Sequence, residues 1–306
     1  MFERLLPDVI NRALVKYDRR KICEIRLRRN APVIINYIGK NKTLTYGNAN
    51  ESVYASGEII DFVLKKATEN SLYAYNNQIK QGFITARGGI RLGISGESVN
   101  SDSFMPTTIK NIHSINMRIP HEVKDCSSLV FSFIYSKDNG IKSTLIISPP
   151  GAGKTTYLRD ICRKLSNLDE KIYNTMLVDE RFELASTLDG CPMLDVGKFT
   201  DVVSGASKEF AFSNGIRALK PDVIITDEIM NESDALACVN AVNSGVKVIA
   251  SIHAENIHEI EQRQGVNALI KSKVFERYVI LSNKRGIGLC ESIYDESLKC
   301  VYFWGG

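Results

Sequence analysis

The chain contains no run of apolar residues approaching the roughly 18 that a membrane-spanning helix needs. Its first residues, Met-Phe-Glu-Arg-Leu-Leu-Pro-Asp, lack the basic start and the long apolar core of a secretory signal. The seven cysteines are scattered, odd in number and without a C-x-x-C pair, and there are only four histidines. These absences argue against a disulfide framework and against a zinc site. We therefore expect a cytoplasmic protein whose cysteines are buried free thiols.

The composition is that of an ordinary folded protein with an uneven charge distribution. The 306 residues, 44% hydrophobic and 24% charged, give room for about two domains with separate cores. Residues 1–140 carry 20 Lys and Arg against 13 Asp and Glu, a net charge of +7. Residues 141–306 carry 19 against 22, a net charge of −3. The basic first half could contact nucleic acid, an acidic lipid surface or the nucleotide of a neighbouring subunit, although solvated faces are the commonest cause.

The spacing of apolar residues divides the chain into two parts joined by a connection. Residues 1–122 indicate a small α+β domain, with helices at 2–18 and 56–66 and strands at 24–28, 32–37, 82–86, 90–94 and 111–119. The two strands at 82–86 and 90–94 form a hairpin. Residues 123–142 indicate a connection with one helix centred on 129–134.

Residues 143–306 alternate between strand and helix patterns. Strands are expected at 144–147, 172–178, 222–226, 247–252 and 277–282, and helices at 154–166, 232–244 and 257–271. A hairpin of 286–291 and 299–303 ends the chain. Such alternation predicts an α/β fold with a largely parallel sheet covered on both faces.

The segment 144–156 has the strand, glycine-bearing loop and helix of a Walker A phosphate loop. Gly151 and Gly153 allow backbone N–H groups to turn towards a phosphate, and the helix start adds further N–H donors. Lys154 would reach the β- and γ-phosphates, and the Thr155 hydroxyl would bind Mg²⁺. The expected nucleotide-binding residues are Pro150, Gly151, Ala152, Gly153, Lys154, Thr155 and Thr156.

A second apolar strand, within 220–228, ends in two acids at the position of a Walker B motif. Asp227 would hold Mg²⁺ through water, and Glu228 would orient or deprotonate the attacking water. A Walker B strand about 70 residues after a Walker A loop is much more specific than either motif alone. The pair predicts an ATP·Mg²⁺ site.

Three further features have both a functional and a structural interpretation. The acids and arginine of 179–183 follow a strand, where they could face a ligand crevice or simply cap a helix entrance. His253 also follows a strand and could sense the γ-phosphate, although a lone histidine is more often structural. An arginine finger contributes about 10³–10⁵ in rate, so one is expected. The candidate arginines are Arg87, Arg91, Arg118 and Arg217, and the sequence does not choose among them.

The sequence motifs also narrow the class of nucleotide-binding enzyme. A GTPase needs N-K-x-D and D-x-x-G, and the nearest segments, Asn283-Lys-Arg-Gly286 and Asp227-Glu-Ile-Met230, match neither. A small-molecule kinase would not usually place Glu directly after the Walker B Asp. ATP hydrolysis is therefore favoured. A nucleic-acid-dependent ATPase using the basic first half, and an assembly factor that binds ATP with little turnover, are the alternatives.

With these motifs in place, the chain resembles the stage III sporulation AA family of endospore-forming bacteria, which is related to type II and type IV secretion ATPases. The resemblance covers nearly the whole chain. It is carried by an ordered series of segments: 24–28, 89–97, 114–119, 149–156, 178–185, 215–223, 227–229 and 250–253. Two departures are Ser148, which replaces the first glycine of the phosphate loop, and 195–212, which lacks a Cys-Pro and Met-rich signature.

The resemblance implies a RecA-like ATPase domain, an N-terminal domain packed over the nucleotide, and a hexameric ring. It places the ring at the cytoplasmic face of a membrane, on the mother-cell side of a channel into the forespore. Membrane-embedded channel proteins are then the expected partners, and nucleic acid is not. Glu180, in an acid box, and His253, in a histidine box, gain catalytic roles beside Lys154, Arg217 and Glu228. Arg87, Arg91 and Arg118 become candidates to reach the nucleotide from the N-terminal domain.

Overall fold

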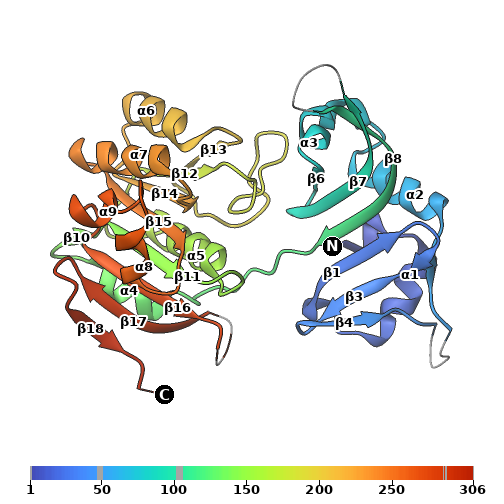
Figure 1. Ribbon diagram of the computed structural model, residues 1–306, viewed down its shortest axis with the longest axis horizontal. Helices are drawn as coiled ribbons and strands as arrows, with labels where there is room; N and C mark the ends of the chain where they lie inside the picture. Colours follow the sequence, from blue (N-terminus) through green and yellow to red (C-terminus); the bar gives the residue numbers. More distant parts are fainter. Residues whose placement is uncertain (1, 47–50, 101–105, 285, 287, 306) are drawn as a thin grey trace. The chain divides into compact units, whose positions relative to one another are not determined.

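The computed structural model describes residues 2–46, 51–100, 106–284, 286 and 288–305 (Figure 1). The chain divides into two compact units, each with its own hydrophobic core. The first unit contains residues 1–121 and 186–193, and the second contains 122–185 and 194–306. Within the described ranges, no helix has both the length and the apolar character needed to cross a bilayer.

The first unit is built on a six-stranded antiparallel sheet in the order β4-β3-β1-β8-β7-β6. Alternate residues such as Ile25 and Met117, which pair across β1 and β8, are fully buried in its core. The strands are β1 (Ile22–Arg28), β2 (Ala31–Pro32), β3 (Ile34–Tyr37), β4 (Lys40–Thr43), β5 (Tyr54–Ala55), β6 (Phe83–Ala86), β7 (Ile90–Asn100) and β8 (Pro106–Arg118). The helices are η1 (Phe2–Leu5), α1 (Asp8–Ala13), η2 (Leu14–Lys16), η3 (Arg19–Lys21), α2 (Gly57–Ala67), η4 (Leu72–Tyr75) and α3 (Asn76–Lys80).

The structure confirms the second helix and the hairpin expected in this unit but corrects its first helix. The expected hairpin is β6 and β7, and Gly88 and Gly89 in its turn have φ of 81° and 71°. Ser56 caps α2 by accepting a hydrogen bond from the Ile59 N–H. A single helix over 2–18 is wrong, because the segment forms three short helices. Pro7 stands before α1 with an extended ψ of 159°, and the helix starts only after it.

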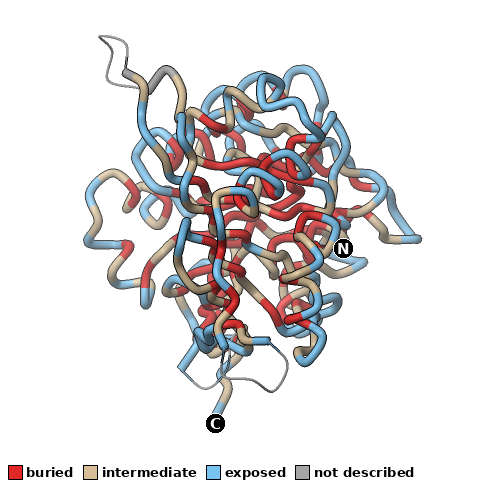
Figure 2. Tube along the Cα trace, turned by 90° about the vertical axis from the view of Figure 1, so that its right-hand side faces the viewer, coloured by how far each residue is buried: buried red, intermediate tan, exposed pale blue. Residues whose placement is uncertain are grey.

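The second unit contains an eight-stranded sheet in the order β13-β12-β14-β15-β11-β16-β17-β18. The first six strands are parallel, and β17 and β18 are antiparallel additions at one edge. Strands β11, β12, β14 and β15, at the centre of the sheet, are buried along almost their whole length. Buried residues are drawn red in Figure 2. The strands of this unit are β9 (Tyr135–Ser136), β10 (Gly140–Ile141), β11 (Thr144–Ser148), β12 (Thr175–Asp179), β13 (Thr200–Ser204), β14 (Val223–Glu228), β15 (Lys247–His253), β16 (Arg277–Ser282), β17 (Leu289–Asp295) and β18 (Cys300–Phe303). The helices are α4 (Ser128–Ile134), α5 (Lys154–Ser166), α6 (Lys208–Leu219), α7 (Glu232–Asn243), α8 (Ile257–Gln262) and α9 (Ala268–Lys271).

Helices cover both faces of this sheet, as expected for parallel strands that are apolar throughout. Along β11, Leu145 and Ile147 lie in the core that includes residues of α6 and α7. Ile146, between them, lies in the opposite core, which includes residues of α4 and α5. The carboxyl ends of β11, β12, β14 and β15 consequently meet at one edge of the sheet.

Three expectations for the second unit were wrong or incomplete. The helix expected over 257–271 is interrupted between α8 and α9, where Gly265 adopts a left-handed φ of 88°. The strand expected over 286–291 starts at Leu289, and residue 287 lies outside the described residues. Strand β13 and helix α6 were not predicted. Gly215 lowers the helix propensity of α6, but a Cβ there would overlap the Met176 side chain of β12, so any larger residue would force Met176 to move.

The expectation of buried thiols holds for only part of the cysteine set. All seven cysteines are free. Burial raises the pKa of Cys162, Cys238 and Cys290 to about 12. Cys191 and Cys300 are exposed instead, which corrects the prediction for these two residues.

Candidate functional site

The phosphate loop joins β11 to α5, with the geometry that its glycines suggest. Gly151 and Gly153 have φ of 74° and 94°, a left-handed conformation that other residues rarely adopt. Gly153 is the N-cap of α5, and the first turn contains Thr155 and Thr156, both half-buried. The first N–H groups of a helix have no partner within the helix, so this turn presents donors to an anion. The loop fits a phosphate chain.

Lys154 lies within the loop, surrounded by neutral acceptors. Its Nζ donates to the carbonyls of Ser148 and Pro149, at 3.1 and 3.2 Å, and to the Ser148 hydroxyl at 3.1 Å. The same Nζ lies 2.8 Å from Nδ1 of His253. Burial lowers the pKa of Lys154 to about 8, although the charge of Glu228 opposes this shift. A phosphate would supply the negative charge that favours the ammonium form, so Lys154 fits the nucleotide it is expected to bind.

His253 and Glu228 join the loop through the strand order. Because β15 lies between β11 and β14, His253 is the register partner of Ser148, and Glu228 is the register partner of Ser251. Nε2 of His253 faces the Glu228 carboxylate at 3.5 Å. If Nδ1 accepts from Lys154, the proton of a neutral His253 is on Nε2, towards Glu228. The three side chains thus form a continuous polar chain at the sheet edge.

Asp227 is buried behind this edge, with 8% of its surface exposed. Its Oδ1 lies 3.2 Å from the Lys208 ammonium and forms an ion pair with it. Among the described residues, no donor has the geometry of a hydrogen bond to this oxygen. Burial raises the pKa of Asp227 to about 6 against the lowering effect of Lys208. A carboxylate oxygen that can still accept is what the water shell of a bound Mg²⁺ requires. Asp227 and Thr155 therefore fit the metal roles expected of them.

The acid cluster at 179–183 has two different functions. Both oxygens of Asp179 accept backbone N–H groups, from Glu183 at 2.7 Å, Leu184 at 3.0 Å and Ala185 at 2.8 Å. Asp179 therefore builds the turn after β12, as the structural interpretation of the cluster proposed. Glu180 instead forms an ion pair with Lys208 at 2.8 Å, and Arg181 lies 3.8 Å from Glu228. The catalytic role expected of Glu180 stays a prediction.

The candidate arginines are divided between the two units. Arg217 lines a groove of about 470 Å³ between α6 and α7, together with Phe212 and Leu236. In the first unit, Arg91 and Arg118 are register partners on β7 and β8, and Arg87 pairs with Glu69. The Arg91 guanidinium lies 4.2 Å from the centre of the Phe83 ring, and Arg118 lies 3.6 Å from Glu24. Their roles towards a nucleotide remain predictions.

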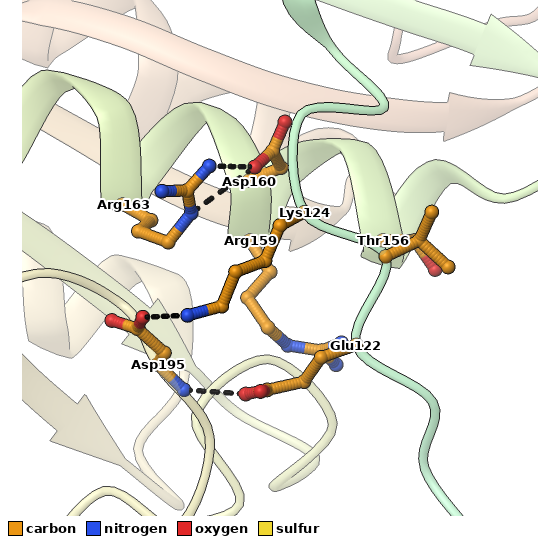
Figure 3. Close-up of a pocket in the computed structure, with 8 residues that line it drawn as sticks. Glu122, Lys124, Thr156, Arg159, Asp160, Arg163 and Asp195 are labelled. Carbon is orange, nitrogen blue, oxygen red and sulfur yellow. Dashed lines mark hydrogen bonds and ion pairs between the residues drawn. The ribbon is translucent and has the colours of Figure 1, made fainter. Parts of the chain in front are cut away.

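The start of the second unit packs against the face of α5 that presents Arg159, Asp160 and Arg163 (Figure 3). Lys124 pairs with Asp195 at 3.1 Å, and the Asp195 N–H donates to Glu122 at 2.7 Å. Arg159 and Arg163 of α5 line the same pocket, as does Thr156. The cavity measures about 10 Å³, room for about one water molecule. The pocket is therefore a packing contact between α5 and the segments at 122–124 and 195, and it is too small for a nucleoside.

Lys208 is the site residue that sequence reasoning missed. It lies in the segment 195–212, which departs from the family signature, and it follows the Ser207 cap of an unpredicted helix. A lysine in the first turn of a helix is usually solvated, so the sequence gives no sign that Lys208 is 1% exposed. Only the contact with acids from three other elements reveals it.

The chain matches a known protein family over almost its whole length. The family described as sporulation stage III, protein AA, matches residues 2–301. Stage III sporulation protein AA of Bacillus subtilis is 31% identical over 297 residues, 95% of this chain and 94% of that protein. A ycf45 protein of Cyanidium caldarium, of uncharacterised function, is 29% identical over 52% of this chain and 46% of its own.

Solved structures of an ATPase and of a pilus motor share the fold. The ATPase DotB of Legionella pneumophila has a TM-score of 0.59 at 13% identity, over 90% of this chain and 76% of its own. The pilus retraction motor PilT, solved with ADP, has a TM-score of 0.60 at 15% identity, over 89% and 76%. The expected α/β fold, with a largely parallel sheet in the second unit, is thereby confirmed. By the match to almost its whole length, the chain belongs to the sporulation stage III, protein AA family.

Proposed function

We propose that this protein is an ATPase of the secretion type, which hydrolyses ATP at the edge formed by β11, β15, β14 and β12. The observation that carries the proposal is the convergence of Lys154, His253, Glu228 and Asp227 beside a loop with two left-handed glycines. These residues come from the ends of two different strands and the start of one helix, so sequence proximity does not explain their meeting.

Each residue has a distinct role in this proposal. Lys154 and the N–H groups of the loop hold the β- and γ-phosphates, and Thr155 and Asp227 hold Mg²⁺. The bound Mg²⁺ neutralises charge on the phosphates. Glu228 orients and deprotonates the attacking water, because it is less buried than Asp227 and faces His253. His253 contacts both Lys154 and Glu228, so it is placed to couple phosphate contact to the water-activating base.

The proposed ATPase works as a hexameric ring at the cytoplasmic face of a membrane, on the mother-cell side of a sporulation channel. Family membership and the fold shared with DotB and PilT support this setting. In this proposal residues 1–122 form the N-terminal domain, 123–142 the connection and 143–306 the ATPase domain. In a ring, Arg87, Arg91 or Arg118 would act on a nucleotide in trans, and Arg217 within the ATPase domain.

The net charge of +7 on residues 1–140 is the specific observation that favours a nucleic-acid-dependent ATPase as a second candidate. Such an enzyme would hydrolyse ATP faster with added RNA or DNA, and the stimulation would fall steeply with salt. A third candidate, an assembly factor, would bind ATP·Mg²⁺ with little turnover.

The decisive experiment measures ATP hydrolysis by wild type, Glu228→Gln and Glu261→Gln. Losing a general base costs about 10²–10⁴ in rate, so Glu228→Gln should retain at most about 1% of the activity and still bind ATP. Glu261, which pairs with His258 at the exposed surface, is the matched control and should keep wild-type activity. Equal rates for Glu228→Gln and wild type would refute the assignment of the base. Light scattering with ATP·Mg²⁺ tests the ring, and a monomer at high protein concentration would contradict it.

A further inference from the structure

The burial of Lys208 and its position at a helix start both disfavour its positive charge. Its side chain is 1% exposed, and it is the first residue of α6. A cation in the first turn of a helix faces the positive end of the helix dipole. Removing an ammonium from water adds a further penalty. Its surroundings must therefore supply specific negative charge.

Three carboxylates from three separate elements supply that charge. Nζ of Lys208 lies 2.8 Å from Glu180 Oε2, 3.2 Å from Asp227 Oδ1 and 3.8 Å from Asp234 Oδ2. Glu180 follows β12, Asp227 is the second-last residue of β14, and Asp234 lies in the first turn of α7. Burial alone would lower the pKa of Lys208, but the carboxylates outweigh it and raise the pKa. The lysine therefore joins the starts of two helices to the ends of two strands.

We propose that Lys208 is a positioning residue of the ATPase site, which holds the Asp227 and Glu180 carboxylates in the orientation that a bound Mg²⁺ requires. The inference rests on the proposed function, because it assigns Asp227 to the metal. Lys208 contacts Asp227 at Oδ1 and also contacts Glu180, so one ammonium fixes both side chains. Without it, two neighbouring carboxylates would repel each other and turn apart.

An opposing effect has to be weighed. A lysine near a metal-binding carboxylate also repels the metal, so its removal could tighten Mg²⁺ binding. Groups that orient a metal ligand usually matter more: their loss typically costs about 10–100-fold in metal affinity or activity. Lys208 is also a permanent part of a buried cluster and not a mobile surface cation. Orientation should therefore dominate, and the Mg²⁺ requirement should rise when Lys208 is removed.

The test compares Lys208→Met with wild type and with Lys247→Met, a control at the start of β15, where Lys247 pairs with Glu276 at 2.7 Å. Binding of a fluorescent ATP analogue is measured first in EDTA and then during Mg²⁺ titration. In EDTA all three proteins should bind within about twofold. Mg²⁺ should increase the affinity for the nucleotide, and the midpoint of this increase defines the Mg²⁺ requirement. The midpoint concentration should rise about tenfold in Lys208→Met and stay unchanged in Lys247→Met.

The remaining outcomes each decide the question. An unchanged or lower Mg²⁺ requirement in Lys208→Met overturns the proposal, as does a wild type whose nucleotide binding ignores Mg²⁺. If Lys208→Met does not fold, Lys208→Met/Asp234→Asn removes one cation and one anion together, and its Mg²⁺ requirement decides by the same criterion. Nucleotide binding requires no turnover. A wild type that binds ATP·Mg²⁺ without hydrolysing it would therefore refute the ATPase function while leaving the Lys208 test valid.

Discussion

Asp160 offers the sharpest test of how residues 122–128 are held against α5 in the second unit. Its carboxylate, 4% exposed, accepts the Ser127 hydroxyl at 2.6 Å, the Ser127 and Asp125 N–H groups at 3.0 Å each, and Arg163 at 2.7 Å. In Asp160→Asn, one oxygen becomes an NH₂ group, which cannot accept from the two Ser127 donors on that side. Each hydrogen bond to a charged group contributes about 1.5–3 kcal/mol, so we expect destabilisation of about 3 kcal/mol.

Urea unfolding followed by tryptophan fluorescence measures this loss. The chain has one tryptophan, Trp304, and it lies in the second unit, which also contains Asp160. With an m-value near 3 kcal/mol/M, a loss of about 3 kcal/mol lowers the transition midpoint by about 1 M. The control is Asp138→Asn, at an exposed aspartate, where a change within about 0.5 kcal/mol is expected. Equal midpoints for the two variants would refute the role given to Asp160.

The same carboxylate predicts a pH dependence with a defined sign. Burial alone would raise the pKa of Asp160, but hydrogen bonds from Ser127 and Arg163 outweigh it, and the pKa lies below its usual value. A lowered folded-state pKa gives stability that is complete above the unfolded pKa, near 3.9, and is lost as the pH falls through the folded value. The difference between wild type and Asp160→Asn should therefore be full at pH 6 and shrink below about pH 4. A difference that grows towards acid would contradict this sign.

Two further substitutions test packing and loop chemistry. Gly215→Ala would normally stabilise a helix by up to about 1 kcal/mol, but overpacking against Met176 costs about 1–3 kcal/mol, so we expect net destabilisation in the same urea assay. A higher urea midpoint would show that the Met176 side chain moves aside at little energetic cost. Ser148→Gly should change ATP turnover by less than about threefold, because Lys154 keeps the Ser148 and Pro149 carbonyls after losing one hydroxyl bond. A tenfold loss would give Ser148 a role in the chemistry.

The parts of this structure that the sequence predicts are those encoded locally. The phosphate loop needs only a strand, two glycines and a helix start within 144–156, and all three lie next to one another in the chain. The Ser56 cap and the Gly88-Gly89 turn are equally local. Two apolar strands that end in acids also predict the sheet edge, because parallel strands end together.

What the sequence could not predict depends on contacts between distant residues. Gly215 appears unfavourable in a helix until Met176 is seen against it. Lys208 appears to be a surface lysine until the topology brings Asp227 and Glu180 to it. Asp179 and Glu180 are adjacent in the chain, yet one builds a turn and the other faces the lysine. No pattern of residue types distinguishes those neighbours, because their roles are set by side-chain direction.

The uneven burial of the cysteines makes this protein suitable for site-selective labelling without mutagenesis. Thiols react as thiolates, and burial keeps Cys162, Cys238 and Cys290 protonated and covered at neutral pH. The exposed thiols are Cys191, in the first unit, and Cys300, in the second. A maleimide donor and acceptor pair on these two native residues would report the separation of the units by energy transfer. Any change in this separation on addition of ATP·Mg²⁺ could then be measured in the wild-type chain.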